Sequence, residues 1–261
     1  MRAISRVCDV SLNTVDKLLV DAGNACAAFH AATVIGVKAK RVQCDEIWSF
    51  CFSKQSNTPA EGSRIGRGDV WTWTALDADS KLIISWMVGD RDAEAASLFI
   101  SDLKNRLASR VQLTTDGHHA YLDAVEDAFD GDVDYSMLVK LYGASVEGKA
   151  GSAERRYSPA KVIGTRYERI CGAPNAQYTS TSYTERHNLT MRMQMRRFTR
   201  LTNGFSKKFD NHCHALTLYF VWYNFVKLHK AHKLTPAMAA GITDKLWSVE
   251  DIVALVEASE S

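Results

Sequence analysis

The chain has 261 residues, of which 46% are hydrophobic and 24% are charged, with 15 glycines and 4 prolines. This composition is typical of a globular protein with a full hydrophobic core, and it excludes the disordered and fibrous classes. No signal peptide opens the chain, and charged residues interrupt every apolar run before it reaches the roughly 18 residues of a membrane span, so we expect a cytoplasmic protein with no membrane partner.

The net charge of +2 conceals an uneven distribution. Between residues 186 and 233 there are ten basic residues and one acidic residue, a local charge of +9 on an otherwise mildly acidic chain. Such a segment indicates either a polyanion-binding surface or ordinary solvated helix faces. The six cysteines form no C-x-x-C pair, which favours reduced, buried thiols over a zinc or disulfide site, and we expect the histidines of this segment to pack rather than to bind metal.

Residues 1–22 have the pattern of a partial helix-turn-helix. Ala3 to Cys8 and Leu12 to Val20 are predicted helices, and Ser11 is the expected N-cap of the second. Apolar residues are spaced as in a helix-turn-helix core, and the second helix could enter a major groove. Two plain surface helices are the alternative. The apolar positions are Ile4, Val7, Val10, Val15, Leu18 and Leu19, and the candidate DNA-binding residues are Asn13, Thr14 and Lys17.

Residues 23–40 are predicted to form a linking helix, and from residue 41 the apolar period changes to two. Strands are predicted at 41–52, 70–76 and 82–88, as an antiparallel meander. A helix at 92–107, a strand at 111–116, a helix at 118–129 and a strand at 133–139 follow. This order predicts an α/β fold with a mixed sheet flanked by helices.

Two acidic residues stand out on the predicted sheet. Asp45 lies on the less apolar face of the first strand, and Asp116 ends the fourth strand, where ligands gather in such sheets. Glu46 falls in the apolar register. A buried carboxylate there is either a second functional acid or a paired structural one, and the pattern favours the structural role.

The last part of the chain is predicted to be mostly helical. Residues 140–182 show little periodicity and are expected to form a basic insertion or extended loop. Helices are predicted at 183–201 and at about 211–229. The expected helical tail, 236–261, begins with a short helix capped by Thr235 and ended by Gly241. Its last helix, 249–257, has a capping box from Ser248 and Asp251.

Three acids are candidates for chemistry: Asp45, Asp116 and Glu185. They are 71 and 69 residues apart, so only the folded chain could bring them together. Carboxylates suit Mg²⁺, and a pair of such ions supports phosphoryl transfer. Arg192 and Arg196 are expected on the same helix face as Glu185. By spacing alone, ordinary surface or cap acids remain the simpler interpretation.

Several motifs that follow one another along the chain favour a functional interpretation of these acids. Together they resemble transposases of the insertion sequence one family over residues 41–256. These motifs are Cys44-Asp45-Glu46-Ile47-Trp48; Thr115-Asp116-Gly117 followed by Tyr121; Glu185-Arg186-His187-Asn188-Leu189-Thr190 running through Phe205-Ser206-Lys207-Lys208; and Tyr223-Asn224-Phe225 to Thr235-Pro236-Ala237.

The resemblance implies an RNase-H-like catalytic domain, residues 41–235, that cuts and joins DNA during transposition. Asp45, Asp116 and Glu185 would be its catalytic residues and would bind Mg²⁺, with Mn²⁺ as a substitute. The implied partners are the terminal inverted repeats of the element, the target DNA and further copies of the chain, in the bacterial nucleoid. The residues implied in DNA binding are Asn188, Arg192, Arg196, Arg197, Arg200, Lys207 and Lys208.

Members of this family usually carry a zinc-binding segment and a complete helix-turn-helix upstream, whereas this sequence begins within the latter. The transposase hypothesis therefore has two rivals. One is a truncated remnant that acts only as a DNA-binding protein, and the other is an RNase-H-like nuclease that hydrolyses DNA and never joins it. Strand-transfer products separate the transposase from both.

Overall fold

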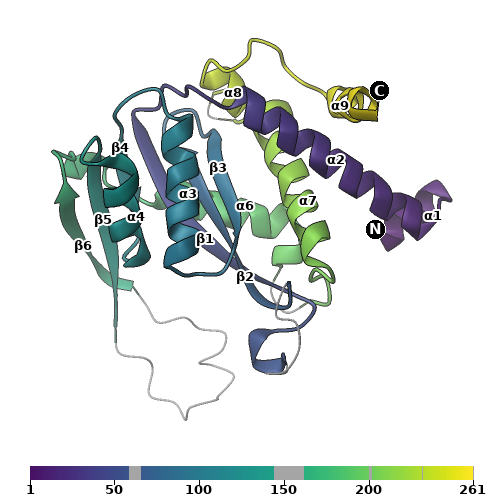
Figure 1. The fold of residues 1–261 in the computed structure, drawn as a ribbon, viewed down its shortest axis with the longest axis horizontal. Helices are drawn as coiled ribbons and strands as arrows, with labels where there is room; N and C mark the ends of the chain where they lie inside the picture. Colours follow the sequence, from purple (N-terminus) through teal and green to yellow (C-terminus); the bar gives the residue numbers. More distant parts are fainter. Residues whose placement is uncertain (59–65, 144–161, 200–201, 231, 261) are drawn as a thin grey trace.

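A six-stranded mixed sheet forms the centre of the computed structural model, which describes residues 1–58, 66–143, 162–199, 202–230 and 232–260 (Figure 1). Helices flank the sheet, and its spatial order is β3-β2-β1-β4-β5-β6. The architecture is consistent with the predicted RNase-H-like α/β class. The strands are β1 (Arg41–Cys51), β2 (Gly68–Asp77), β3 (Ile83–Gly89), β4 (Gln112–Thr115), β5 (Asp134–Tyr142) and β6 (Val162–Cys171).

Strand directions change at the centre of the sheet. The first three strands form the predicted antiparallel meander, whereas β1, β4 and β5 run parallel to one another and β6 is antiparallel to β5. The chain extends the sheet to one side of β1 through β2 and β3, and then crosses to the other side at β4. The gap between β1 and β4 is thus a switch point, the place where α/β sheets bind ligands at the carboxyl ends of their strands.

Helices cover both faces of this sheet (Figure 1). Two of them, α3 (Ala93–Arg106) and α4 (Ala120–Phe129), pack on one face, and α6 (Ser182–Gln194) lies on the other. The long α2 (Leu12–Thr33) crosses α7 (Phe209–Val221) beside the sheet. The remaining helical elements are α1 (Arg2–Cys8), the π-helical turn η4 (Trp222–Val226), α8 (Pro236–Ala239), α9 (Val249–Glu260) and the short 3₁₀ turns η1 (Gln55–Asn57), η2 (Ala176–Tyr178) and η3 (Arg196–Phe198). Among the described residues, no helix has both the length and the apolar character needed to cross a membrane.

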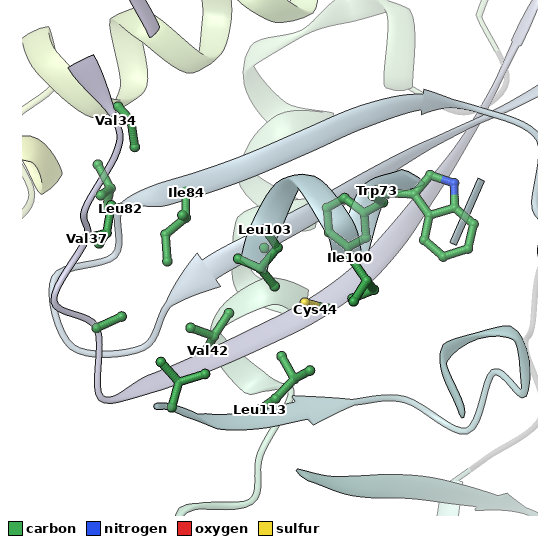
Figure 2. Packing of buried hydrophobic residues seen from close by; sticks show 14 of the residues in the cluster. Val34, Val37, Val42, Cys44, Trp73, Leu82, Ile84, Ile100, Leu103 and Leu113 are labelled. Carbon is green, nitrogen blue, oxygen red and sulfur yellow. The ribbon is translucent and has the colours of Figure 1, made fainter. Parts of the chain in front are cut away.

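The two faces of β1 belong to two hydrophobic clusters. On one face, Val42 and Cys44 pack with Ile100 and Leu103 of α3 (Figure 2). On the other face, Ile47 packs with residues of α6 and α7. The less apolar face of the predicted strand is therefore also covered, because α6 and α7 lie over it. On this covered face, Asp45 is partly exposed at the point where β1 no longer pairs with β4.

The N-terminal helices differ from the expected helix-turn-helix. Ser11 caps α2 as predicted, with its Oγ accepting from the Thr14 N–H at 3.0 Å. However, α2 continues without a break from Leu12 to Thr33, so the predicted change from recognition helix to linking helix at residue 23 does not occur. The predicted apolar core also does not form between the two helices, since Ile4 is 52% exposed and Val7 is 84% exposed. α2 packs instead on α7 and α9, and α1 contributes no buried residue.

The region after β4 contains two further differences from the sequence prediction. The expected extended loop at 140–182 is wrong at its ends, because β5 continues to Tyr142 and β6 pairs with it; residues 144–161 of the expected insertion lie outside the described residues. An edge strand exposed on most of its length gives little hydrophobic periodicity, which explains the missed strand. The predicted helix 183–201 ends at Gln194, since Met195 has extended backbone angles, and a 3₁₀ turn follows.

The predicted caps of the two C-terminal helices are confirmed, whereas the helix predicted at about 211–229 ends at Val221 and continues as the π-helical turn η4. Thr235 caps α8, with its Oγ1 accepting from the Met238 N–H at 3.2 Å, and Gly241 follows that helix with a φ of 70°. At α9, the Ser248 N–H donates to the Asp251 carboxylate at 2.8 Å, as a capping box requires.

Candidate active site

A pocket of about 490 Å³ opens where β1 and β4 separate. The two strands pair only as far as Gln43 and Thr114, so Asp116 leaves β4 at about the level of Asp45 on β1. Glu185 of α6 completes the pocket wall. The fold therefore brings together three acids that are far apart in the sequence. The other lining residues are Arg91, Gly117, His118, His119, Leu138, Val139, Lys140, Tyr142 and Thr181.

The pocket depends on how α6 is attached to β1. The side chain of Gln43, buried on the β1 face that α6 covers, accepts hydrogen bonds from the backbone N–H groups of Tyr183 at 2.9 Å and Thr184 at 3.3 Å. These are first-turn N–H groups, which have no partner within the helix. Gln43 therefore fixes the start of α6 beside β1, and Glu185, one residue further, reaches the pocket.

Asp45 is held by two hydrogen bonds. Its Oδ1 accepts from the backbone N–H of Glu46 at 2.9 Å, and its Oδ2 accepts from Asn188 Nδ2 at 2.8 Å. Burial first, and then the negative charges of Glu46, Asp116 and Glu185, together raise the pKa of this carboxyl to about 7. The protein thus holds several carboxylates close together against their mutual repulsion, an arrangement that a bound cation would stabilise.

The other two predicted acids each lie beside a basic side chain. An oxygen of Asp116 is 3.7 Å from the guanidinium of Arg91, and the other oxygen accepts from the His118 N–H at 2.9 Å. Glu185 Oε1 is 2.6 Å from the Lys140 ammonium, which comes from β5 on the opposite side of the pocket. Both acids are partly exposed, so they remain accessible from the pocket.

Glu46 is a fourth carboxylate at this site. Its Oε2 accepts from Arg91 Nε at 3.0 Å, so the carboxylate has a basic partner, as the structural interpretation expected. Burial is the main reason that its pKa is raised, and the charge of Asp116 adds to it, while Tyr121 and Arg91 lower it. Oxygen atoms of Asp45, Glu46 and Asp116 lie within 4.8 Å of one another, which makes these the group of described residues best arranged to hold a metal ion.

The donor set suits a hard divalent cation. It consists of carboxylate oxygens, with the amide of Asn188 alongside, and contains no cysteine sulfur. Mg²⁺ and Mn²⁺ prefer such oxygen ligands. One of these oxygens, Glu46 Oε1, is buried without a hydrogen-bond partner among the described residues, as is Asn188 Oδ1. The residues present therefore fit a divalent metal ion.

The predicted DNA-binding residues are spread over several surfaces. Asn188 is in the pocket wall, bonded to Asp45. Arg192 follows it on α6 and is partly buried. Arg196 is exposed on η3, outside the helix that carries Glu185 and Arg192, so its predicted place on that helix is wrong. Arg197 points inward, where its guanidinium donates to Ser206 Oγ at 2.8 Å and burial lowers its pKa.

The remaining predicted DNA-binding residues lie further from the pocket. Lys207 and Lys208 are exposed in the loop before α7, and Arg200 lies outside the described residues. The candidates of the N-terminal segment are exposed on the first turns of α2, at the end of the molecule away from β4 and β5 (Figure 1); these are Asn13, Thr14 and Lys17.

Two functional candidates were missed in the sequence. Arg91 follows β3 and Lys140 is near the end of β5, and both place a cation against the acids of the pocket. Lys140 was missed because the predicted strand ended at Val139, whereas β5 continues to Tyr142 and pairs with β4. Arg91 could not be identified, because its contact with Glu46 spans 45 residues and two strands.

Comparisons with known proteins give little that bears on this chain. No family model matches it, and no curated protein matches it. Among solved structures, it is similar to a piggyBac transposase in a synaptic complex with hairpin DNA, at 11% identity and a TM-score of 0.34. The match covers 85% of this chain and 52% of that one, so the chain spans about half the length of that transposase. Similarity at this level does not establish a common function.

Proposed function

We propose that the protein is a DNA transposase of an insertion sequence, similar to the insertion sequence one family, that cuts DNA and joins the freed 3′ end to a target. The observation that carries the proposal is the meeting of Asp45, Asp116 and Glu185 in one pocket at the switch point of the sheet. An arbitrary set of three surface acids, separated by 71 and 69 residues, has no reason to converge at the place where such sheets bind ligands.

In this proposal, Asp45, Asp116 and Glu185 hold Mg²⁺ or Mn²⁺ through carboxylate oxygens. Metal ions held by these carboxylates would supply the positive charge that activates the attacking oxygen and stabilises the leaving oxygen of a phosphodiester. Asn188 orients the Asp45 carboxylate through its hydrogen bond. Chemistry of this kind depends on positioning and on charge neutralisation, and needs no covalent intermediate with the protein.

The basic side chains around the pocket would contact the DNA backbone. Lys140 lines the pocket, Arg196 is exposed just beyond α6, and Lys207 and Lys208 are exposed in the loop before α7. Contacts of this type position a duplex without reading its sequence, and they make binding sensitive to salt. A complex that brings two element ends together also calls for more than one copy of the chain, so we propose a homo-oligomer on DNA.

A strand-transfer assay tests the proposal. Labelled duplexes from the DNA that flanks the coding sequence on each side are incubated with purified protein, a supercoiled plasmid and either Mg²⁺ or EDTA. We expect labelled DNA to be joined to the plasmid with Mg²⁺ only. Asp116→Asn should abolish joining, because it removes a charged ligand from the pocket, whereas the same change at the exposed Asp123 of α4 should leave joining intact.

The other outcomes decide between the rival functions. Metal-dependent nicking that never gives joined product would identify a nuclease. DNA binding with neither nicks nor joined product, at any metal concentration, would identify a non-catalytic DNA-binding protein. Equal activity of wild type and Asp116→Asn would refute the catalytic role of the pocket.

A further inference from the structure

Glu46 has no role in the triad described above, yet it reaches the same site. Neighbouring residues of a strand point to opposite faces, so Asp45 faces α6 while Glu46 faces α3 and α4. Because β4 stops pairing with β1 just before this point, side chains from both faces of β1 can approach Asp116 at the strand edge. Oxygens of the three residues then lie within 4.8 Å of one another. Glu185 does not belong to this group.

The surroundings of Glu46 do not account for a purely structural carboxylate. Its side chain is only 1% exposed, and Arg91 satisfies Oε2 alone. The other oxygen, Oε1, makes no well-formed hydrogen bond among the described residues; the nearby Tyr121 hydroxyl is likewise unpartnered, and its interaction with the carboxylate lowers the pKa of Glu46. A buried charged oxygen without a partner is strongly unfavourable, and native proteins retain such a group mainly where a ligand completes it.

A second unpartnered polar atom belongs to a residue that contacts this cluster. Asn188 is buried, and its Nδ2 is bound to Asp45, which places the amide at the acid cluster. Its Oδ1 has no partner among the described residues. Amide and carboxylate oxygens are both ligands for hard divalent cations.

Arg91 is the present counter-charge of the cluster. Its guanidinium is 3.0 Å from Glu46 and 3.7 Å from Asp116, and it lies over the ring of Trp71 at 5.0 Å. It is about one-third exposed, so it has room to move away. A divalent cation between Glu46 and Asp116 would take over the neutralisation that Arg91 provides.

We infer that Glu46 is a metal ligand, and that Asp45, Glu46 and Asp116 together form one cation site from which Glu185 is absent. The inference rests on the proposed function, since it assigns ligands to the metal chemistry of the same pocket. Glu185, paired with Lys140 across the pocket, is left to a separate cation position.

Titration with Mn²⁺ alone tests the inference, with free Mn²⁺ followed by electron paramagnetic resonance. Glu46→Gln removes the charge and keeps the length of the side chain, whereas Glu46→Asp keeps the charge and withdraws the oxygens from the site. We expect both to weaken the tightest Mn²⁺ site by at least about 10-fold, because loss even of a residue that only orients a metal ligand costs about 10- to 100-fold in affinity. Glu185→Gln should weaken it by less, and Glu94→Gln, the same change at an exposed residue of α3, should have no effect.

Thermal melting in EDTA provides a second readout. As a metal ligand, Glu46 carries a negative charge close to those of Asp45 and Asp116, and this repulsion destabilises the metal-free protein. Glu46→Gln should therefore melt at a higher temperature than wild type. A structural partner of Arg91 would give the opposite result. Wild-type Mn²⁺ affinity in a folded Glu46→Asp variant would overturn the inference and leave the proposed function intact. If wild type binds no Mn²⁺, the inference and the proposed metal chemistry both fail.

Discussion

Asn224 joins two distant parts of the fold, and its removal should measurably destabilise the protein. It is fully buried in the π-helical turn η4. Its Oδ1 accepts from the Ile83 N–H at 3.0 Å, and its Nδ2 donates to the Ile83 carbonyl at 2.9 Å. One side chain thus satisfies both backbone groups of the first residue of β3 and fastens η4 to the sheet.

The expected size of the effect follows from these contacts. In Asn224→Ala the Ile83 N–H is left buried without a partner, which costs about 1–3 kcal/mol. The carbonyl keeps only a long contact of 3.5 Å to His30 Nε2, and the lost side-chain atoms leave a small cavity. We therefore expect a loss of about 2–4 kcal/mol, or roughly 4–16 °C in the melting temperature of a chain of this size.

Urea and thermal denaturation, followed by circular dichroism, measure this loss. Asn203→Ala, at an exposed position before α7, is the matched control and should change stability by about 0.5 kcal/mol or less. Asn224→Leu should not restore stability, because an apolar side chain leaves the same backbone groups unsatisfied. A loss below about 1 kcal/mol for Asn224→Ala, or full recovery with leucine, would refute the reasoning.

Three further predictions concern pH, packing and DNA. Burial lowers the pKa of His30 to about 3, so this residue contributes its full stabilisation of the fold above pH 6.5. The contribution to the free energy of unfolding should fall by about 1.4 kcal/mol per pH unit as the pH decreases toward 3. In acid titrations, His30→Met should reduce the slope of the unfolding free energy against pH by the equivalent of one bound proton. A Cβ on Gly23 of α2 would lie 2.4 Å from the Cβ of His214, so Gly23→Ala should destabilise the α2 and α7 packing by about 1–3 kcal/mol in urea melts; an unchanged midpoint would contradict the close approach. Replacing Lys207 and Lys208 by alanine should lower the slope of log affinity for duplex DNA against log salt by roughly 1.8, with the melting temperature unchanged; an unaltered slope would exclude phosphate contacts there.

Local pattern predicted most of the elements of this chain. The alternation that begins at Arg41, the turn after β2 and the 3.6-residue period of α3 identified the meander, the first crossover helix and the strand that ends at Asp116. These signals are local, since they reflect which side of a single strand or helix is buried. They failed where burial was weak, at the exposed edge strand β6, and where the backbone changed conformation within an apolar run, at Met195.

The site required the tertiary structure. The sequence identified Asp45, Asp116 and Glu185 as candidates, but spacing alone gave no reason for them to meet. Their proximity follows from the sheet order, which places β4 beside β1, and from Gln43, which attaches the start of α6 to β1. Sheet order and side-chain attachment depend on contacts between residues that are distant in the chain, and no local pattern records them.

The two interpretations of Glu46 also differ in whether they depend on local pattern or on contacts between distant residues. Its place in the apolar register correctly predicted a buried carboxylate with a partner, because alternation along one strand reports burial. Only the folded chain brings Arg91 to one oxygen of that carboxylate, leaves the other oxygen without a partner among the described residues, and places the carboxylate beside Asp45 and Asp116. The sequence by itself thus determined the elements and the acids that they carry, and the tertiary structure decided which of those acids share a site, since that depends on where β4 separates from β1.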